Sequence, residues 1–558
     1  MENKLKLPVG IENFAEIRES GFYYVDKTML IEQLLQNWSK VNLFTRPRRF
    51  GKTLNMSMLR SFLEIGTKET LFDGLYISSN KKLCKEYLGK YPVVFLSLKA
   101  VDGLNFEEAI IRMKTTIQNE ARRHYYLQSS GKLNDYDIRQ YNQLLEGNPV
   151  DITDSLRMLS ELLCKHYDQK VVIIIDEYDV PLDKAFQNDY YDEMVSLIRG
   201  IFGQALKTND FLQFAILTGC LRISKESVFT GLNNFRVFSV LEDRFDEQFG
   251  FSDDEVQDLL VYYGLSDHVA EIKEWYDGYH FGNTDVYCPW DVMNYVDQLR
   301  SNPNAEPQDF WSNSSGNAIV RRFIDKANVQ TRDEIERLIN GEAIAKEIDQ
   351  ELTYKDIDDK IDNLWSVLFT TGYLTQQRKT ADGCYLVSIP NKEIHNLFVK
   401  KIREWFNEVS KKDGKTMEEF CTAFLEGNPG KIEILLGNYL WNTISIRDTS
   451  VVKEKKENFY HGILLGLLGY KDTWLIKSNA ESGIGYSDIL IEVPEGRIGI
   501  VIEIKYAGDG NMTSACEKAM QQIENKNYIA TLQQDGMKHF IKYGIACYKK
   551  DCKVVMGE

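Results

Sequence analysis

The sequence predicts an α/β protein with more than one domain, and three observations support this. With 558 residues, the chain is longer than a single hydrophobic core usually organises. Its first half alternates helical stretches with short apolar runs rich in Val, Ile and Phe, a pattern typical of parallel strands buried on both faces. The C-terminal part begins helical and then becomes strand-like around SDILIEV and RIGIVIEIKYA. The apolar runs of the first half are VNLFT (41–45), YPVVFLSL (91–98), KVVIIIDEYD (170–179) and FLQFAILTG (211–219).

The composition is that of a soluble protein without a membrane span. Hydrophobic residues make up 43% of the chain and charged residues 27%, both ordinary values. No apolar run reaches roughly 18 residues, and the N-terminus lacks the apolar core of a signal peptide. Nine scattered cysteines without C-x-x-C predict reduced thiols in the cytoplasm, and seven histidines without H-E-x-x-H disfavour a zinc enzyme. The net charge of −16 counts against a general polyanion binder but leaves room for a local basic groove.

Two polar stretches predict the domain boundaries. RSNPNAEPQD (300–309) ends the α/β region, and VSKKDGKTM (409–417) precedes the C-terminal segments. Between them, a helix followed by a two-stranded wing predicts a small helical, winged-helix-like module. We therefore expect domains at residues 1–300, 301–410 and 411–558.

The segment FTRPRRFGKTL (44–54) resembles a phosphate-binding loop, G-x-x-x-x-G-K-[ST], with Arg46 in place of the first glycine. It lies between a predicted strand and a predicted helix, the context that such a loop requires. Backbone N–H groups would hold phosphates, Lys52 would reach the β- and γ-phosphates of ATP, and Thr53 would bind Mg²⁺. A basic loop that matches by chance is the alternative. The residues expected at the nucleotide are Arg46, Arg48, Arg49, Phe50, Gly51, Lys52 and Thr53.

Two further strand ends carry residues suited to nucleotide hydrolysis. Asp176 and Glu177 follow five apolar residues and emerge at the carboxyl edge of the sheet, where ligands bind in open α/β folds. Asp176 would hold Mg²⁺ and Glu177 would activate the attacking water. After the next strand, Thr218 could sense the γ-phosphate and Arg222 could neutralise charge in the transition state. The alternatives are a solvated acidic pair and a structural arginine.

Taken together, these segments resemble the bacterial AAA-ATPase-like family. Members of that family have a P-loop allied to those of STAND-type and archaeal ATPases, followed by a winged helix and a PD-(D/E)xK nuclease-like domain. The family's loop also reads RPRRFGK without a leading glycine, so Arg46 fits its pattern. The segments that carry the resemblance are GFYYVDKTMLI, FTRPRRFGKTL, VIIIDEYDVPL, LTGCLRISKESVFTGLNN and WYDGYHFG.

A second candidate site lies in GYSDILIEVPEGRIGIVIEIKYA, which predicts a β-hairpin. The period of two places Glu503 and Lys505 on one face of the second strand. If the loop is symmetric, with two or four residues, Asp488 pairs across from Glu503; a three-residue loop with a bulge at Gly496 would shift the register by one.

This arrangement of Asp and Glu-x-Lys is the pattern of PD-(D/E)xK nucleases. Asp488 and Glu503 would hold Mg²⁺ with the Ile504 carbonyl, and Lys505 would orient a water or stabilise developing charge. A surface ion pair between Glu503 and Lys505 is the alternative.

The resemblance to such nucleases adds three residues to the second site. It implies that Glu457, from the preceding helix, completes the metal site and that Gln522 and Tyr528 border it. Ala480 and Tyr486 stand where the family usually has basic residues, which weakens the expectation of turnover more than that of the fold.

We therefore expect an α/β protein with a P-loop parallel-sheet ATPase domain, a winged-helix module and a restriction-endonuclease-like domain. It would use ATP and Mg²⁺ and act as a nuclease on nucleic acid, with DNA favoured over RNA. One alternative is an ATP-driven switch whose C-terminal domain binds DNA or a partner protein without cutting. Another is a nonspecific nuclease with a purely structural ATPase half. The sequence allows a homo-oligomer.

Overall fold

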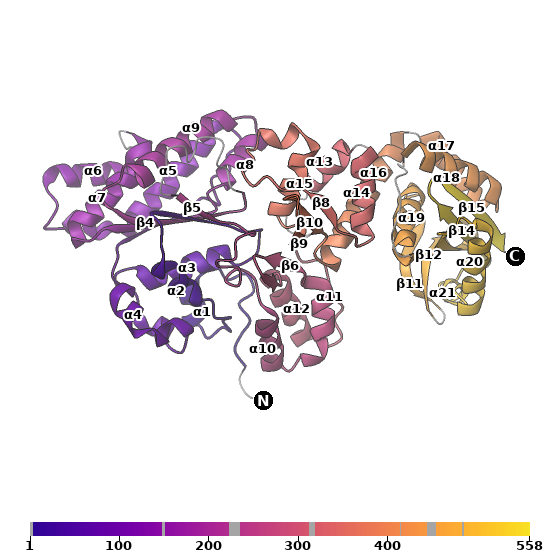
Figure 1. Cartoon of the computed structure of the whole chain (residues 1–558), viewed down its shortest axis with the longest axis horizontal. Helices are drawn as coiled ribbons and strands as arrows, with labels where there is room; N and C mark the ends of the chain where they lie inside the picture. The colour runs from indigo at the N-terminus through magenta and orange to yellow at the C-terminus, as the bar shows by residue number, and fades with distance from the viewer. Residues whose placement is uncertain are drawn as a thin grey trace. The chain divides into compact units, whose positions relative to one another are not determined.

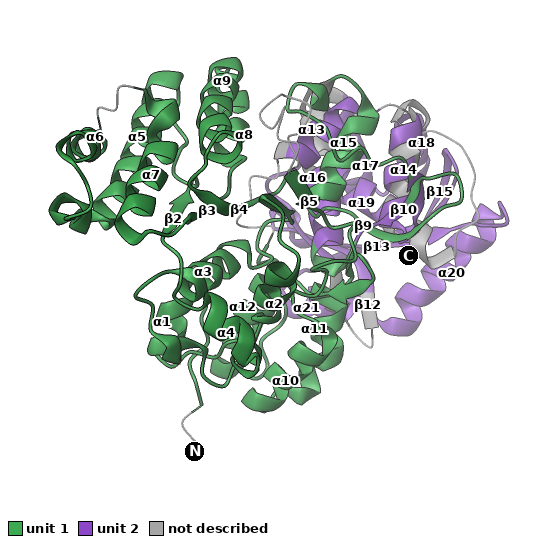
Figure 2. Cartoon of the chain, turned by 60° about the vertical axis from the view of Figure 1, so that its left-hand side comes forward, with its two compact units in different colours: residues 1–315, 346–385, 390–393 green, residues 316–345, 386–389, 394–558 purple. Residues whose placement is uncertain are grey.

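The computed structural model describes residues 4–147, 151–221, 235–311, 318–327, 329–412, 414–443, 453–482 and 485–557. The chain divides into two compact units, shown in Figure 2. Unit 1 comprises residues 1–315, 346–385 and 390–393, and unit 2 comprises residues 316–345, 386–389 and 394–558. The division falls inside the segment 301–410, which the sequence predicts to be a separate module.

Unit 1 contains a five-stranded sheet among its described residues, with the order β2-β3-β4-β1-β5. Every pair of neighbours in it is parallel. This confirms the parallel α/β sheet that the apolar runs predict, and the order places β4 between β1 and β3. The strands are β1 (Val41–Thr45), β2 (Val93–Ser97), β3 (Val171–Asp176), β4 (Leu212–Gly219) and β5 (Phe235–Phe238).

Helices cover both faces of this sheet, with α1 to α4 on one side and α5 to α9 on the other (Figure 1). The covering explains why β1 and β3 are buried at every position. These helices are α1 (Phe14–Glu19), α2 (Met29–Gln36), α3 (Lys52–Leu63), α4 (Lys81–Tyr87), α5 (Phe106–Arg123), α6 (Asp135–Glu146), α7 (Ser155–Tyr167), α8 (Val180–Gln187) and α9 (Tyr191–Phe202).

A helical segment with a short hairpin follows the sheet in unit 1. Its helix α10 (Asp253–Tyr263) begins with a capping box formed by Ser252 and Glu255, which satisfies backbone N–H groups at the helix start. The hairpin strands are β6 (Tyr279–Phe281) and β7 (Thr284–Val286), and the flanking helices are α11 (Val269–Tyr276) and α12 (Pro289–Ser301).

The middle of the chain contains a helix followed by two strands, as the sequence predicts. These are α15 (Ile361–Thr370), β9 (Thr375–Lys379) and β10 (Tyr385–Ser388). Their assignment to a winged helix remains a prediction. The other elements of this part are α13 (Ala318–Lys326), α14 (Val329–Ile339), β8 (Ile344–Lys346) and α16 (Lys392–Lys412).

Unit 2 contains a mixed sheet with the order β11-β12-β13-β14-β15, in which only the β13–β14 pair is parallel among the described strands. Alternate residues of β13 face two cores: Ile500, Ile502 and Ile504 pack with α17 to α19, and Val501 packs with α20 and α21. The elements are α17 (Gly414–Leu425), α18 (Pro429–Thr443), α19 (Lys453–Leu468), β11 (Leu475–Ser482), β12 (Gly485–Val493), β13 (Ile498–Tyr506), α20 (Met512–Lys526), α21 (Ile529–Gln534), β14 (His539–Tyr548) and β15 (Asp551–Gly557).

Within the described part of the chain, no helix is both long enough and apolar enough to cross a membrane.

Candidate functional site

The candidate nucleotide site lies at the carboxyl edge of the parallel sheet. Thr45 at the end of β1 is level with Gly219 of β4, and Ser97 of β2 is level with Asp176 of β3. Because the strands are parallel, the residues that follow each strand meet at this one edge. The loop after β1 is joined to β4 by a hydrogen bond from the backbone N–H of Arg46 to the Gly219 carbonyl (3.1 Å).

The loop between β1 and α3 has the backbone of a phosphate-binding turn. Gly51 has φ of 76° and caps α3, a conformation that glycine adopts without steric cost. Lys52 is buried, and its Nζ donates to the carbonyl oxygens of Arg46 (3.1 Å) and Pro47 (2.8 Å). The ammonium group therefore lies inside the arch of its own loop, beside the positive end of a helix, where anions bind.

Asp176 connects the phosphate loop to the end of β4. Its carboxylate is fully buried and accepts hydrogen bonds from the hydroxyls of Thr53 (2.8 Å) and Thr218 (2.5 Å). The hydroxyl and carboxylate oxygens of this cluster are donors that Mg²⁺ accepts, so the residues fit the predicted ion. The position of β4 between β1 and β3 explains why Thr218 can reach Asp176.

Glu177 has a strained backbone and a raised pKa. Its φ is 52°, unusual for a residue with a side chain. Burial is the main cause that raises the pKa of its carboxyl, and the positive charge of Lys52 opposes the shift. A carboxyl with a raised pKa beside a phosphate site is suited to accept a proton from water.

Lys52, Thr53 and Glu177 line a cavity of about 480 Å³ in unit 1, within the range of small-molecule sites. Asp176 and Thr218 lie behind Thr53 and are not part of the lining. The lining of the cavity combines polar groups of the phosphate loop, Lys99 and Glu177 with a set of apolar side chains. The apolar lining residues include Val9, Ile11, Ile17, Tyr23, Val25, Phe251, Pro289, Trp290 and Met293.

Arg46 is placed differently from its sequence prediction. Its guanidinium is fully buried and donates to the carbonyl oxygens of Thr45 (2.9 Å), Phe238 (2.8 Å) and Phe245 (3.1 Å). It also lies over the ring of Phe249, at 5.0 Å from the centroid. Burial lowers its pKa to about 9. The side chain therefore links the start of the loop to the end of β5 and to the chain that follows it, and it does not line the cavity.

The next residues of the loop do line the cavity, although their side chains are also anchored to protein. Arg49 stacks on Trp290 at 4.4 Å and donates to the Phe310 carbonyl (3.1 Å). Phe50 is buried against Tyr279, at 4.8 Å between centroids. Arg48 is half-exposed and lies 3.7 Å from Asp183. Arg222 lies outside the described residues.

Asp179, Lys99 and Glu12 were not predicted from the sequence. Asp179 accepts hydrogen bonds from the backbone N–H groups of Cys220 (2.7 Å) and Leu221 (3.0 Å), which fixes the chain after β4. Lys99 and Glu12 both line the cavity. The signal for Lys99 was available, because it follows the apolar run 91–98 and so lies at the same sheet edge as Asp176.

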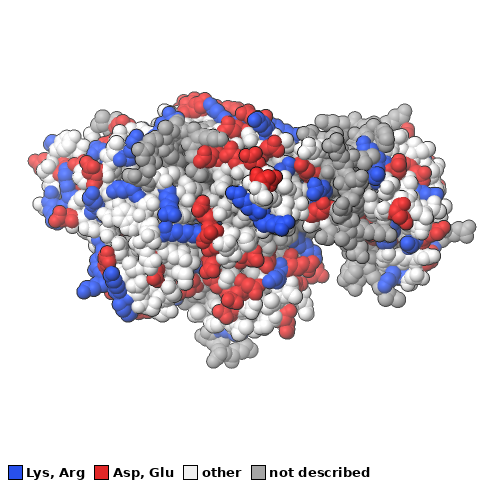
Figure 3. Space-filling view, viewed as in Figure 1, with Lys and Arg blue, Asp and Glu red and all other residues white. Residues whose placement is uncertain are grey.

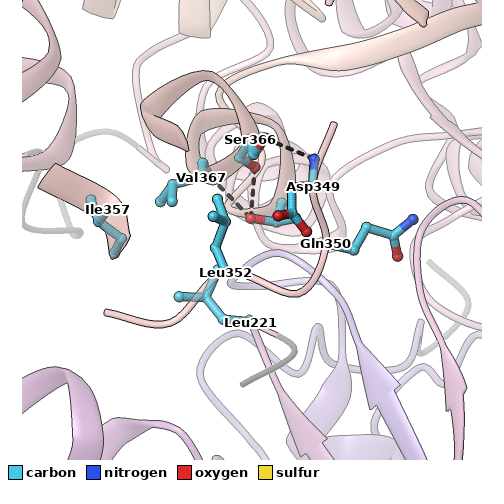
Figure 4. A pocket seen from close by; sticks show the side chains of 8 residues that line it. Leu221, Asp349, Gln350, Leu352, Ile357, Ser366 and Val367 are labelled. Carbon is cyan, nitrogen blue, oxygen red and sulfur yellow. Dashed lines mark hydrogen bonds between the residues drawn. The ribbon is translucent and has the colours of Figure 1, made fainter. Parts of the chain in front are cut away.

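A second cavity near the end of β4 is too small to hold a ligand. Its volume is about 10 Å³, room for roughly one water molecule. Figure 4 shows its lining, in which the backbone N–H of Asp349 donates to Ser366 Oγ (3.0 Å). The lining residues are Leu221, Asp349, Gln350, Leu352, Ile357, Ser366, Val367 and Thr370.

The second candidate site lies on the β12–β13 hairpin of unit 2. Val493 pairs with Ile498, and the register continues without a shift to Ile489 opposite Ile502. The loop therefore contains the four residues 494–497, so the symmetric alternative is the one that forms. In this register the next pair is Asp488 and Glu503, and Asp488 Oδ2 accepts from the backbone N–H of Ile504 (2.7 Å).

Glu503 is almost completely buried, and its two oxygens have different surroundings. Oε1 accepts from Lys505 Nζ (2.8 Å), whereas Oε2 has no hydrogen-bond partner among the described residues. Burial, followed by the negative charge of Asp488, raises the pKa of this carboxyl to about 7. Lys505 Nζ also lies 3.7 Å from Glu457 Oε2, while Glu457 Oε1 accepts from the backbone N–H of Tyr506 (3.1 Å).

These groups are suited to bind a divalent cation, although they do not form a complete coordination site. In the described ranges, no group of three or more His, Cys, Asp or Glu side chains is arranged to hold a metal ion. The free Glu503 Oε2 and the neighbouring Asp488 carboxylate nevertheless offer hard oxygen donors, and Mg²⁺ often takes only one or two carboxylates from a protein. The backbone N–H of Ile504 donates a hydrogen bond to Asp488. The role of the Ile504 carbonyl as a metal ligand stays a prediction.

Helices on both faces of the sheet contribute further residues to this site. Gln522 of α20 donates to the hydroxyl of buried Tyr528 (3.1 Å). Burial is the main cause that raises the pKa of Tyr528, and the negative charges of Glu503 and Asp488 act in the same direction. His461 was not predicted: its Nε2 lies 2.7 Å from the Asp488 carbonyl oxygen. The signal was its position four residues after Glu457, on the same face of α19.

Two protein families and one relative match this chain. Residues 8–229 match the family described as Predicted AAA-ATPase, and residues 455–556 match the PD-(D/E)XK nuclease superfamily. A protein of Azotobacter chroococcum mcd 1, described as "Uncharacterized protein in vnfD 5'region", is 26% identical over 400 residues, which cover 70% of this chain and 69% of the relative. The first match contains the phosphate loop and Asp176, and the second contains Asp488 and Glu503. The chain therefore carries a predicted AAA-ATPase-like domain followed by a C-terminal domain of the PD-(D/E)XK nuclease superfamily.

Proposed function

We propose that the protein is a Mg²⁺-dependent ATPase whose C-terminal domain is a metal-dependent nuclease that acts on DNA. The observation that carries the ATPase half is the hydrogen-bonded cluster of Thr53, Asp176 and Thr218, whose member Thr53 lines a cavity of about 480 Å³ together with Lys52. The two matched families support this combination of domains.

In the ATPase domain, each residue has a role that follows from its place. Lys52 would leave the carbonyl oxygens of its loop for the β- and γ-phosphates, and Thr53 and Asp176 would hold Mg²⁺. The bound ion supplies positive charge beside the phosphates. Glu177 would accept the proton of the attacking water, a role that its raised pKa favours.

In the nuclease domain, Asp488 and Glu503 would hold a divalent cation. Glu457 Oε2 lies 3.7 Å from Lys505 Nζ, next to this pair. The bound ion supplies charge that lowers the pKa of a water and stabilises the scissile phosphate. Lys505 would orient that water or stabilise the charge that develops. Gln522 and Tyr528 would border the bound strand.

Surface charge disfavours one face of unit 1 as the nucleic-acid site. Acidic side chains gather over α10 to α12 in Figure 3, where they would repel phosphates. The exposed acidic residues of this segment are Asp254, Asp258, Asp267, Glu274, Asp285 and Asp297.

A second candidate is an ATP-driven switch whose C-terminal domain binds DNA or a partner protein without cutting. The observation that favours it is the presence of Ala480 and Tyr486 where related sequences usually have basic residues. Fewer cations near a metal site weaken the binding of a scissile phosphate.

Three proteins separate these functions: the wild type, Lys52→Ala and Lys505→Ala. Each is assayed for ATP hydrolysis and for Mg²⁺-dependent cleavage of linear, branched and single-stranded DNA. The main proposal expects Lys505→Ala to lose cleavage and keep ATP hydrolysis. DNA binding by the wild type without cleavage would favour the switch, and full cleavage by Lys52→Ala would favour a nuclease that does not need the ATPase. A wild type without ATP hydrolysis would contradict the ATPase half.

A further inference from the structure

Lys99 lines the candidate nucleotide cavity and has no role in the proposal above. It follows β2, whose last residue, Ser97, is level with Asp176 on β3, and the backbone N–H of the intervening Leu98 donates to the Asp176 carbonyl (3.0 Å). The side chain is 57% exposed and lines the same cavity as Lys52 and Glu177. Lys99 thus lies just after β2, the strand that neighbours β3 on the side away from β4.

The partner of Lys99 is another residue of the cavity wall. Its Nζ donates to Glu12 Oε1 (2.9 Å) and lies 3.3 Å from Oε2. Glu12 is 54% exposed and belongs to the N-terminal segment that lines the cavity. Its hydrogen bond is the main cause that raises the pKa of Lys99, and the charges of Glu177 and Asp176 act in the same direction.

Two other cations of the cavity wall are held more firmly. Lys27 is buried and donates to Glu255 (2.6 Å) and to the Glu247 carbonyl (2.8 Å). Arg49 is stacked on Trp290. By contrast, an exposed pair such as Glu12–Lys99 is weak, because water screens it and two long side chains must be ordered to form it. A phosphate group with several charged oxygens is a stronger partner for the same ammonium group.

We propose that Lys99 is a second phosphate-binding cation, which contacts the terminal phosphate of a bound nucleoside triphosphate, and that Glu12 holds Lys99 until the nucleotide binds. This inference rests on the proposed ATPase function and adds a residue that distinguishes a triphosphate from a diphosphate. Lys52 spans the β- and γ-phosphates, so its loss weakens both nucleotides, whereas the loss of Lys99 weakens the triphosphate alone.

The test compares the binding of two probes in the presence of Mg²⁺: ADP and an ATP analogue with a non-hydrolysable imido bridge between the β- and γ-phosphates. Isothermal titration of Lys99→Met is expected to show a loss of affinity of about tenfold for the analogue and less than about twofold for ADP. Lys99→Arg retains the charge and should bind both probes like the wild type.

Glu12→Gln tests the second half of the proposal. It removes the competing carboxylate, so the affinity for the analogue should rise by about two- to fivefold, and this gain should vanish when Lys99→Met is added. Lys68→Met is the matched control, because Lys68 forms a similarly exposed pair with Glu19 (2.6 Å) away from the cavity lining. It should change neither affinity.

The outcomes distinguish this proposal from the proposed function. If the wild type binds both probes and Lys99→Met binds the analogue normally, or loses both probes equally, the role of Lys99 is wrong and the ATPase function stands. If the wild type binds neither probe, both proposals fail. A melting temperature of Lys99→Met equal to that of the wild type confirms that the variant is folded.

Discussion

The nucleotide cavity of unit 1 and the carboxylate site of unit 2 are built on different kinds of backbone. The cavity depends on turns with left-handed residues, including Arg49 (φ 72°), Gly51 (φ 76°) and Glu177 (φ 52°). The second site lies on a regular hairpin, where Asp488 and Glu503 follow from an unbroken register. Strained turns persist only where surrounding structure holds them, whereas a hairpin site is fixed by pairing close in sequence. We therefore expect each site to be disrupted by substitutions in its own unit without loss of ligand binding at the other.

Each unit also contains a buried carboxyl with a raised pKa. Asp291 of α12, near Arg49, and Glu503 of β13 both reach a pKa of about 7, mainly because of burial. Glu503 has Asp488 and Lys505 as neighbours, a set suited to a metal ion. Asp291 instead lies near Cys288, Glu393 and Asp309, and the Arg49 guanidinium limits its shift.

The largest expected effect is therefore a pH dependence of unit 1. Because the pKa of Asp291 is raised from 3.8 to about 7, its contribution to stability is fully present below about pH 4 and is lost as the pH rises through 7. The difference between these two pKa values corresponds to on the order of 4 kcal/mol. Asp291→Asn should remove this part of the pH dependence, measured by urea unfolding of unit 1 between pH 5 and 8. Equal slopes in both proteins would contradict the shift.

The next effect tests how tightly the turn after β4 is packed. A methyl group on Gly219 would lie 2.6 Å from Tyr178 Cε1 and 2.7 Å from Asp179 Oδ1, so Gly219→Ala should destabilise unit 1 by about 1–3 kcal/mol and weaken ATP binding. Gly203→Ala is the matched control, since its added methyl meets nothing within 4 Å.

Gly544→Ala is the counterpart in unit 2. There the added methyl would lie 2.9 Å from the Cys516 carbonyl oxygen, so unit 2 should be destabilised while ATP binding is unchanged. Calorimetry of both variants, combined with nucleotide titration, checks the prediction. Loss of ATP binding in Gly544→Ala would show that the two sites do not fail separately.

A smaller effect is expected from Mg²⁺ on unit 2. At ten times its Kd, the ion should stabilise this unit by about 1.4 kcal/mol, a rise in Tm of roughly 3–6 °C. Asp488→Asn removes one carboxylate and should abolish the rise. Differential scanning calorimetry with Mg²⁺ or with EDTA measures it, and a rise that persists in the variant would place the ion elsewhere.

The smallest effect concerns His461. Its hydrogen bond to the Asp488 carbonyl (2.7 Å) should contribute about 1 kcal/mol to the stability of unit 2. His461→Ala should lose this amount in urea unfolding, whereas His461→Gln, which can still donate, should lose less. An equal loss in both variants would mean that the hydrogen bond is not the cause.

The same contrast explains which features could be predicted from the sequence. The faces of Glu503 and Lys505 follow from a period of two, and Lys52, Thr53 and Asp176 follow from strand ends at one sheet edge. The register of the hairpin could not be decided, because its four-residue loop needs left-handed conformations at Gly496 (φ 80°) and also at Arg497 (φ 53°). An arginine gives no signal for that conformation.

The surroundings of Arg46 could not be predicted from the sequence either. The sequence indicates a charge next to phosphates, but the guanidinium is enclosed by Phe238, Phe245, Phe249 and Phe281, which lie about 200 residues further along the chain. The apolar lining of the cavity is similar, since Tyr23 and Trp290 come to line the same cavity only through the tertiary fold. Local sequence patterns therefore predicted the reactive residues of the sites better than the residues that surround them.

The four residues between β12 and β13 have a consequence for how unit 2 could change. Neighbouring residues of a strand point to opposite faces, so the deletion of one residue from 494–497 would move Asp488 out of step with Glu503 without altering either side chain. An insertion of one residue would have the same result. In this hairpin the spacing of the chain, as much as the chemistry of its side chains, keeps two acids together, so a gap in an aligned sequence at this turn would be as informative as a lost carboxylate.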